Sequence, residues 1–228
     1  MPRIDLQVPF AEKENAKRLG ARWDAEKKVW YIPDGVDCAP LKKFLPHEPT
    51  IKIRSSNYYI AESSEACWKC NETTRVYGIL LPAEHETLEP IDEADAGFGS
   101  DDQFEEADFQ VWLDSAESSR WVKSDEPTII HYVSHIASNV IAHIHRLSQN
   151  YRVDFSKTTQ SSYWMNHCEH CGMKQGDFAI YCEPQGAFFP LSEQDASRIV
   201  LHQVTEFFEG NSGSYSYGVD LFDCMRQT

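Results

Sequence analysis

Two Cys-x-x-Cys pairs constrain the fold of this chain more than any other feature of its sequence. They are Cys67 with Cys70 in "EACWKC" and Cys168 with Cys171 in "NHCEHCG". Segments rich in β-branched and aromatic residues flank each pair, so we predict that each pair forms a tight turn between two strands. Gly172, directly after the second pair, suits the unusual backbone angle that such a turn often needs. Two such turns supply four thiolates, the complete tetrahedral ligand set of a structural Zn²⁺, and we predict one zinc site shared by the four cysteines.

The separation of the pairs along the chain leaves alternatives to this site open. The pairs are separated by 97 residues, whereas the pairs of a compact zinc ribbon are about 15 to 20 residues apart. The thiols could instead stay metal-free in the core, or either pair could act as a redox dithiol. A redox pair is expected between a strand and a helix, and neither pair has that setting. His167 and His170 could each replace a cysteine as a ligand, although four thiolates do not require them.

The charge of the chain is unevenly distributed. The formal net charge is -15 over 228 residues, yet residues 1–54 carry 11 Lys and Arg against 8 Asp and Glu. Because an acidic surface repels nucleic acid, any contact with nucleic acid is expected within this N-terminal part or at a local patch. No apolar run reaches the ~18 to 20 residues of a membrane span, and no signal peptide is recognisable. We therefore expect a cytoplasmic protein without a membrane partner, in which an odd cysteine count favours metal binding over disulfides.

Residues 1–48 are expected to form a small α+β module in the order βαββ. Apolar residues alternate in "IDLQVPF", which favours a strand. The segment "AEKENAKRLG" favours a short helix that ends at Gly20, and "ARWDAEKKVWYIP" favours a hairpin. Pro46 and Pro49 then end the regular structure, so we predict the domain boundary there.

The module carries candidate contacts for nucleic acid. Its basic residues could form one face of the helix and of the strand that follows it, where they would meet phosphates. Its tryptophans either fill the core of the module or form a platform on which bases stack. The candidate residues are Lys13, Lys17, Arg18, Arg22, Trp23 and Trp30.

The N-terminal sequence resembles a known family. The residues that carry the resemblance are Val8-Pro9-Phe10, Lys13, Ala16-Lys17, Leu19-Gly20-Ala21-Arg22-Trp23-Asp24, Lys28 and Trp30-Tyr31-Ile32-Pro33. They are similar to a small bacterial domain of unknown function that recurs attached to TraC-type plasmid conjugation primases, and the similarity covers about residues 4–46. The resemblance implies a bacterial protein with a link to the DNA metabolism of mobile elements. It supplies no catalytic residues.

Residues 49–228 are expected to form a zinc-ribbon-like β domain that a long acidic insertion interrupts. The predicted bounds are residues 67–70 and 168–171 for the two knuckles and about 84–120 for the insertion. From Val76 to Ser119 there are 13 acidic residues and no Lys or Arg. A segment of this composition is expected to be solvated. It could instead contact a protein with a basic surface, imitate a phosphate backbone or bind a metal, although it lacks the residue order of a calcium loop.

Two helices are predicted in the second domain. The segment "SDEPTIIHYVSHIASNVIAHIHRLSQ" has an apolar stripe at helical spacing and predicts an amphipathic helix over about residues 126–148. In such a helix His131 and His135 share one face, but the glutamate of a His-Glu-x-x-His zinc motif is absent, so a zinc hydrolase is not predicted. The segment "LSEQDASRIVLHQVTEFFE" predicts a second helix with Ser192 and Asp195 at its N-terminal cap.

The sequence contains no phosphate-binding glycine loop, nucleophile elbow or paired-carboxylate motif. We therefore predict a non-enzymatic zinc-binding protein that acts as an interaction or adaptor module for a protein with a basic surface. The alternative is an accessory protein that binds nucleic acid through residues 1–48. An enzyme would need a pocket built from His131, His135 and acidic residues of the insertion.

Overall fold

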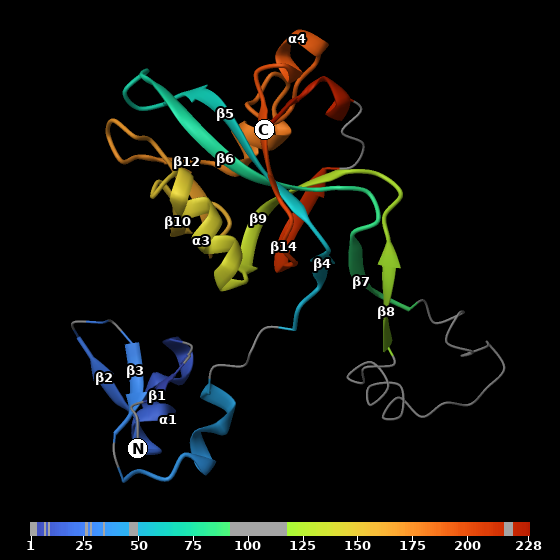
Figure 1. Cartoon of the computed structure of the whole chain (residues 1–228). Helices are drawn as coiled ribbons and strands as arrows, with labels where there is room; N and C mark the ends of the chain where they lie inside the picture. Colours follow the sequence, from blue (N-terminus) through green and yellow to red (C-terminus); the bar gives the residue numbers. More distant parts are fainter. Residues whose placement is uncertain are drawn as a thin grey trace, which may run out of the picture. The chain divides into compact units, whose positions relative to one another are not determined.

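The computed structural model describes residues 4–45, except positions 7, 9, 26, 28 and 34, and residues 50–91, 118–216 and 221–228. Within these residues the secondary structure is mixed α and β, and most of it is sheet (Figure 1). The chain divides into two compact units, Met1–Thr50 and Ile51–Thr228. No helix in the described part of the chain is long and apolar enough to cross a membrane.

The first unit is a three-stranded antiparallel sheet, in the order β1-β3-β2, with short helices packed against one face. Gly20, which directly follows the C-cap residue of α1, has a φ of 101°, in agreement with the predicted end of this helix. The α-helix has only six residues, so more residues of the unit lie in strands than in α-helix. Its core consists of Leu6, Ala16, Ala21, Ile32, Leu41 and Phe44. Its elements are β1 (Ile4–Leu6), η1 (Phe10–Glu12), α1 (Lys13–Arg18), β2 (Arg22–Asp24), β3 (Val29–Ile32) and η2 (Ala39–Phe44).

The second unit is built around a large, mostly antiparallel sheet. Among the described residues, its strands follow the path β15-β13-β5-β6-β9-β14-β4-β7-β8, and β10, β11 and β12 join this path because β11 pairs with β9. The strands are β4 (Ile53–Ser55), β5 (Tyr58–Ala66), β6 (Thr73–Leu81), β7 (Glu86–Pro90), β8 (Ser119–Lys123), β9 (Thr128–Ile136), β10 (Tyr151–Ser156), β11 (Ser161–His167), β12 (Lys174–Gln175), β13 (Val200–Val204), β14 (Phe208–Ser216) and β15 (Arg226–Gln227). The helices are α3 (Ser138–Leu147), the π-helix η4 (Phe178–Cys182), α4 (Glu193–Ala196) and η5 (Phe222–Cys224).

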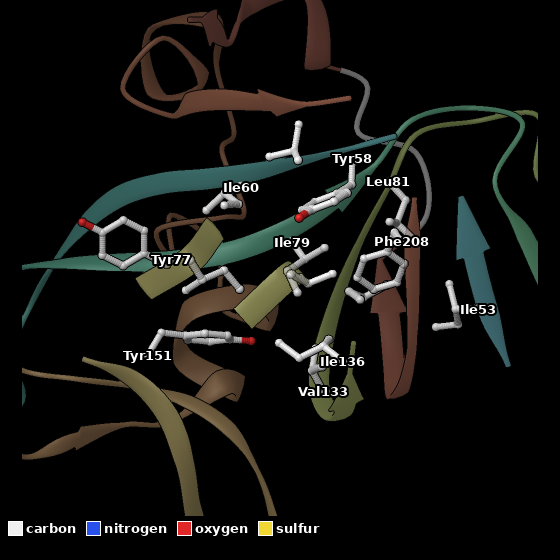
Figure 2. Close-up of a cluster of buried hydrophobic side chains, with 14 residues drawn as sticks. Ile53, Tyr58, Ile60, Tyr77, Ile79, Leu81, Val133, Ile136, Tyr151 and Phe208 are labelled. Carbon is white, nitrogen blue, oxygen red and sulfur yellow. The ribbon is translucent and has the colours of Figure 1, made fainter. Parts of the chain in front are cut away.

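The central strands of the second unit are buried on both faces. Successive side chains of a strand point to opposite faces, and in β5 residues Tyr58 and Ile60 belong to one core whereas Tyr59 and Ala61 belong to another. Figure 2 shows the first core, in which side chains of β5, β6, β9, β10 and β14 lie together. Helix α3 packs on this core, and η4 and α4 pack on the second. Burial on both faces explains why these strands read as nearly continuous apolar runs.

The predicted helix over residues 126–148 is wrong in its first half. The chain forms β9 up to Ile136, and only α3, from Ser138, is helical. The apolar residues of the first half have the spacing of a helix, but Ile129 and Ile130 are both buried because they face the two opposite cores of the sheet. Pairing of β9 with β6 and β14 therefore overrides the local pattern.

The second predicted helix is wrong beyond its first turn. Ser192 does cap α4, because its side chain accepts a hydrogen bond from the backbone N–H of Asp195, but α4 ends at Ala196. The following apolar residues form β13, which pairs with β5, and the chain then turns into β14. Strands on both sides of this segment offer backbone partners, so it adds to the sheet instead of continuing the helix.

The segment between the two cysteine pairs contributes strands to the central sheet. It supplies β6, β9, α3, β10 and β11, and residues of β6 and β9 are part of both cores of the second unit. The most acidic part, residues 92–117, lies outside the described residues. Strands β7 and β8 flank this part and pair with each other, with Glu86 opposite Lys123 at one end and Pro90 opposite Ser119 at the other. The sheet is therefore built from residues on both sides of each cysteine pair.

Strand β9 changes its pairing partner along its length. Residues up to Ile130 pair with β6, and Val133 pairs with Trp164 of β11. Between these positions Tyr132 has a φ of 53°, a left-handed conformation that is costly for an aromatic residue. The backbone N–H of Tyr132 donates a hydrogen bond of 2.7 Å to Oδ2 of Asp177. Asp177 therefore stabilises the left-handed backbone of Tyr132 at the point where the sheet branches.

Asp177 is buried at this branch point. Its burial raises the pKa of its carboxyl from the ordinary value of 3.8 to about 7, although the hydrogen bond from Tyr132 lowers it. Its second oxygen, Oδ1, is buried without a hydrogen-bond partner in the described structure. An ionised carboxylate at this position is therefore unfavourable.

Candidate metal centre

The four cysteines of the two pairs come together in the second unit. Their sulfur atoms all lie within 4.8 Å of one another. The Sγ atoms of Cys67 and Cys171 are 3.7 Å apart, and those of Cys70 and Cys168 are also 3.7 Å apart. Cys67 and Cys168 are buried, Cys70 is half-buried and Cys171 is exposed. This arrangement is compatible with a metal ion bound by four thiolates.

The first cysteine pair forms a tight turn between β5 and β6. The backbone N–H of Asn71 donates to the carbonyl of Cys67 at 2.9 Å, and the N–H of Cys67 donates to the carbonyl of Glu72 at 3.0 Å. Asn71 has a φ of 61°. Asparagine is one of the few residues with a side chain that tolerates this conformation. The turn brings the two thiols of the pair to one side of the hairpin.

The second pair forms the same turn between β11 and β12. The N–H of Gly172 donates to the carbonyl of Cys168 at 2.9 Å, and the N–H of Cys168 donates to the carbonyl of Met173 at 2.8 Å. The φ of Gly172 is 68°, which confirms the conformation predicted for it. Asn71 holds the equivalent position in the first turn, and sequence reasoning missed it. The shared signal was a residue tolerant of positive φ directly after each pair.

The turns aim backbone N–H groups at the sulfur atoms. Burial of Cys67 raises the pKa of its thiol. The backbone N–H groups of Cys70 and Lys69 and the neighbouring thiols outweigh this effect and lower the pKa to about 6. Burial likewise opposes ionisation of Cys168, and the N–H groups of Cys171 and His170 hold its pKa below the ordinary value. These donors stabilise thiolates, which are the forms that bind metal ions.

Cys70 shows the opposite shift. The backbone N–H of Glu72 lowers the pKa of its thiol, but burial and the three other cysteines outweigh this effect and raise the pKa to about 12. Negative charge on one sulfur makes ionisation of the next less favourable. A bound cation would neutralise this charge and favour ionisation of Cys70.

Each turn is tied to the strand that follows the other turn. The indole Nε1 of Trp68, in the first turn, donates to the carbonyl of Lys174 in β12 at 2.9 Å. Glu169, in the second turn, forms an ion pair of 2.6 Å with Arg75 in β6. Gln175 of β12 also donates through Nε2 to Sγ of Cys67 at 3.4 Å. These contacts hold the two hairpins together beside the sulfur atoms.

Asn166 joins β11 to β6 just before the second turn. Its Oδ1 accepts from the backbone N–H of Tyr77 at 2.7 Å, and its Nδ2 donates to the carbonyl of Tyr77 at 2.8 Å. Pairing of β6 with β9 covers only Ile79 to Leu81, so the amide side chain takes the place of a neighbouring strand at Tyr77. Asn166 is only 1% exposed, and sequence reasoning gave no sign of its role.

The histidines beside the second pair bind other groups. The Nε2 atom of His170 is 3.0 Å from the carbonyl of Thr73, and Nε2 of His167 is 3.1 Å from Oδ2 of Asp154. Within the described residues, the four cysteines are the one group of His, Cys, Asp and Glu side chains whose ligand atoms are close enough to hold a metal ion. Neither histidine is part of that group.

The structure does not bring His131 and His135 together as a helical metal site. Both lie in β9, where four residues span roughly 13 Å, instead of the ~6 Å of one helical turn. His131 is buried and stacks on Tyr181, with ring centroids 5.3 Å apart, and burial lowers the pKa of its ring. It acts as a packing residue of the core.

The candidate residues for nucleic acid in the first unit lie on different surfaces. Lys13, Trp23 and Trp30 line one groove. Lys17 and Arg18 are exposed on α1, outside the residues that line this groove. Arg22 precedes Trp23 in β2, and alternation along the strand places it on the opposite face of the sheet. The groove also includes Phe10, which is 82% exposed and which sequence reasoning did not single out.

Comparison with known proteins identifies only the N-terminal part of the chain. Residues 3–46 match DUF5710, a domain of unknown function. A DNA primase TraC of Escherichia coli is 45% identical over 53 residues, which are 23% of this chain and 5% of the primase. A second DNA primase TraC of Escherichia coli is 51% identical over 48 residues, which are 21% of this chain and 3% of the primase. The chain thus aligns with only a small part of these relatives, and no solved structure matches it.

Proposed function

We propose that this protein is a non-enzymatic binding protein whose second unit is stabilised by one structural Zn²⁺ on Cys67, Cys70, Cys168 and Cys171. The observation that carries the proposal is the convergence of the four sulfur atoms. Zinc–sulfur bonds of about 2.3 Å in a tetrahedron place the sulfur atoms ~3.8 Å apart, and two of the sulfur pairs are separated by 3.7 Å. Two identical turns supply the ligands, as zinc knuckles do.

The closed ligand set supports a structural rather than a catalytic metal. A catalytic zinc keeps an open position for water or substrate, and four thiolates leave none. The metal would join two hairpins that are far apart in the sequence, and structural zinc typically contributes about 10 to 16 kcal/mol of apparent binding free energy. Because this zinc would serve the fold and not a reaction, we propose that the protein acts through binding at its surface.

Charge supports a basic partner for the second unit. Residues 51–228 carry 12 Lys and Arg against 28 Asp and Glu. Such a surface attracts a protein with a basic face and repels nucleic acid, and salt screens both effects. Affinity capture from a bacterial extract should therefore recover basic proteins at low salt and lose them at high salt. Recovery of acidic proteins that resists high salt would contradict this part of the proposal.

Metal analysis of the purified protein tests the zinc site. Protein prepared in reducing buffer without added metal should contain about one zinc per chain, and Cys67→Ser should contain little. Cys38→Ser is the matched control, because Cys38 is an exposed cysteine of the first unit and should leave the zinc content unchanged. A folded wild-type protein without metal would overturn the proposal.

A second function is supported by the first unit. Two proteins that share part of its sequence are DNA primases, and its groove combines exposed aromatic rings with a lysine. Both observations favour an accessory protein that binds nucleic acid in mobile-element DNA metabolism. The two functions are compatible, because the large excess of acidic residues belongs to the second unit and the groove belongs to the first.

A further inference from the structure

The first unit contains a groove of about 570 Å³ on the aromatic side of its hairpin. Trp23 and Trp30 are directly opposite each other on β2 and β3, and their ring centroids are 5.6 Å apart at an angle of 58°. Phe10 begins η1, and the Nζ atom of Lys13 lies 4.0 Å from the centroid of its ring. Among the described residues, the lining consists of Leu6, Val8, Phe10, Lys13, Trp23, Val29 and Trp30.

Packing of the core does not explain these aromatic side chains. Phe10 and Trp23 are not part of the core of the unit, and of the three aromatic residues in the groove only Trp30 packs partly against that core. Phe10 is 82% exposed and Trp23 is 49% exposed. Adjacent large apolar side chains on the surface of a soluble unit usually mark a binding site. The groove is therefore better explained by a ligand than by folding.

The chemistry of the lining selects the ligand. The exposed rings offer flat faces on which another ring can stack. Lys13 is the charged residue among the described lining residues, and no acidic residue accompanies it there. A ligand that fits both features carries flat rings and negative charge close together. Single-stranded nucleic acid has this combination, whereas the bases of a duplex hide their faces in the stack.

We propose that this groove binds single-stranded nucleic acid, with bases stacked on Trp23 and Phe10 and with Lys13 at a backbone phosphate. This inference rests on the second proposed function and specifies its site and its ligand. Lys17 and Arg18 on the helix, and Arg22 on the opposite face of the sheet, lie outside the groove. They contribute only long-range attraction.

Binding of a dye-labelled oligothymidine of about 12 nucleotides to the full-length protein tests the proposal. Fluorescence anisotropy at low salt should show binding, and an abasic oligonucleotide of the same length should bind about tenfold more weakly, because it has the phosphates without the bases. Trp23→Ala and Phe10→Ala should each weaken binding of oligothymidine by about tenfold, with little effect on the abasic strand.

Two further sets of variants separate the contribution of ring stacking from that of positive charge. Trp23→Phe keeps an aromatic ring and should retain most of the affinity, which Trp23→Ala loses. Circular dichroism should show that both variants fold. Lys13→Ala should reduce the slope of log Kd against log salt by about 0.7, whereas Arg22→Ala and Lys17→Ala should change Kd by less than about threefold.

The outcomes distinguish the groove from the broader function. If the wild type binds abasic and oligothymidine strands equally, or if Trp23→Ala and Phe10→Ala bind as tightly as the wild type, the groove is not the site. In that case loss of binding in Lys17→Ala or Arg22→Ala would leave the nucleic-acid function in place on another surface. Absence of binding by the wild type at low salt would overturn both.

Discussion

The two units bury their apolar side chains in different ways. The first has one small core on one face of a three-stranded sheet, and its elements are close neighbours along the chain. The second has strands buried on both faces, and its two hairpins with cysteine turns lie 97 residues apart in the sequence. Closing such a long loop costs chain entropy, which the proposed zinc would offset. If the zinc has this role, its loss should unfold the second unit and leave the first unit folded.

Cys168→Ser should have the largest effect, because it should destabilise the second unit and leave the first unit unchanged. It removes a buried thiol of the proposed zinc site, and loss of that zinc should cost about 10 kcal/mol or more, which exceeds the stability of most domains. Amide hydrogen exchange should show that β5 and β6 lose protection while α1 and β3 keep theirs. Cys38→Ser serves as the control. Protection of β5 and β6 that survives the loss of metal would show that the sheet alone stabilises the second unit.

Asn166→Leu should have the next largest effect. The substitution leaves the buried backbone N–H of Tyr77 without a partner. It also removes one hydrogen bond to the carbonyl of Tyr77, which still accepts from the hydroxyl of Tyr181 at 3.2 Å. The expected cost is about 2 to 4 kcal/mol. Urea unfolding followed by tryptophan fluorescence measures this loss. Gln149→Leu replaces an exposed amide close to the same hairpin and should change stability by less than ~0.5 kcal/mol. Equal effects of the two substitutions would mean that the amide of Asn166 does not join the strands.

Asp177→Asn should alter the pH dependence of the second unit. The carboxyl has a pKa of about 7 in the folded protein and ~3.9 when unfolded. The folded state therefore binds more protons between these values, and wild-type stability should fall as the pH rises through this window. The loss amounts to about 2 to 4 kcal/mol by pH ~8.

The amide that Asp177→Asn introduces does not titrate, so the variant should lack this part of the pH dependence. Urea unfolding between pH ~4.5 and ~8 compares the two slopes, and Asp223→Asn replaces an exposed carboxyl as the control. Parallel curves for the wild type and Asp177→Asn would show that the carboxyl does not carry the effect.

Gly172→Ala should have the smallest effect of the four. An added Cβ at Gly172 meets no atom within 4 Å, so the cost comes only from the positive φ. It should be about 1 to 2 kcal/mol, and Gly172→Asn should cost less because Asn71 holds the same position in the first turn. Thermal unfolding ranks the two variants. The reverse ranking would contradict the equivalence of the two turns.

The turns at the cysteine pairs could be predicted because their conformation depends on a few adjacent residues. Strand β9 could not, because its apolar spacing fits a helix and only pairing with β6 and β14 decides the structure. Asn166 was equally hidden, since its role depends on Tyr77, a residue distant in the sequence. Likewise, Phe10 becomes part of a site only when η1 lies beside β2 and β3.

The pairing of β5 with β13 has a consequence for synthesis on the ribosome. The strands of the first unit pair only with one another, so this unit can fold as soon as its own residues have left the ribosome. Strand β5 emerges soon afterwards, but β13 and β14 pair with β5 and β9 only after all the strands between them have been synthesised. Until then the apolar strands β5, β6 and β9 lack part of their cover, and this exposed apolar surface favours aggregation of the nascent second unit.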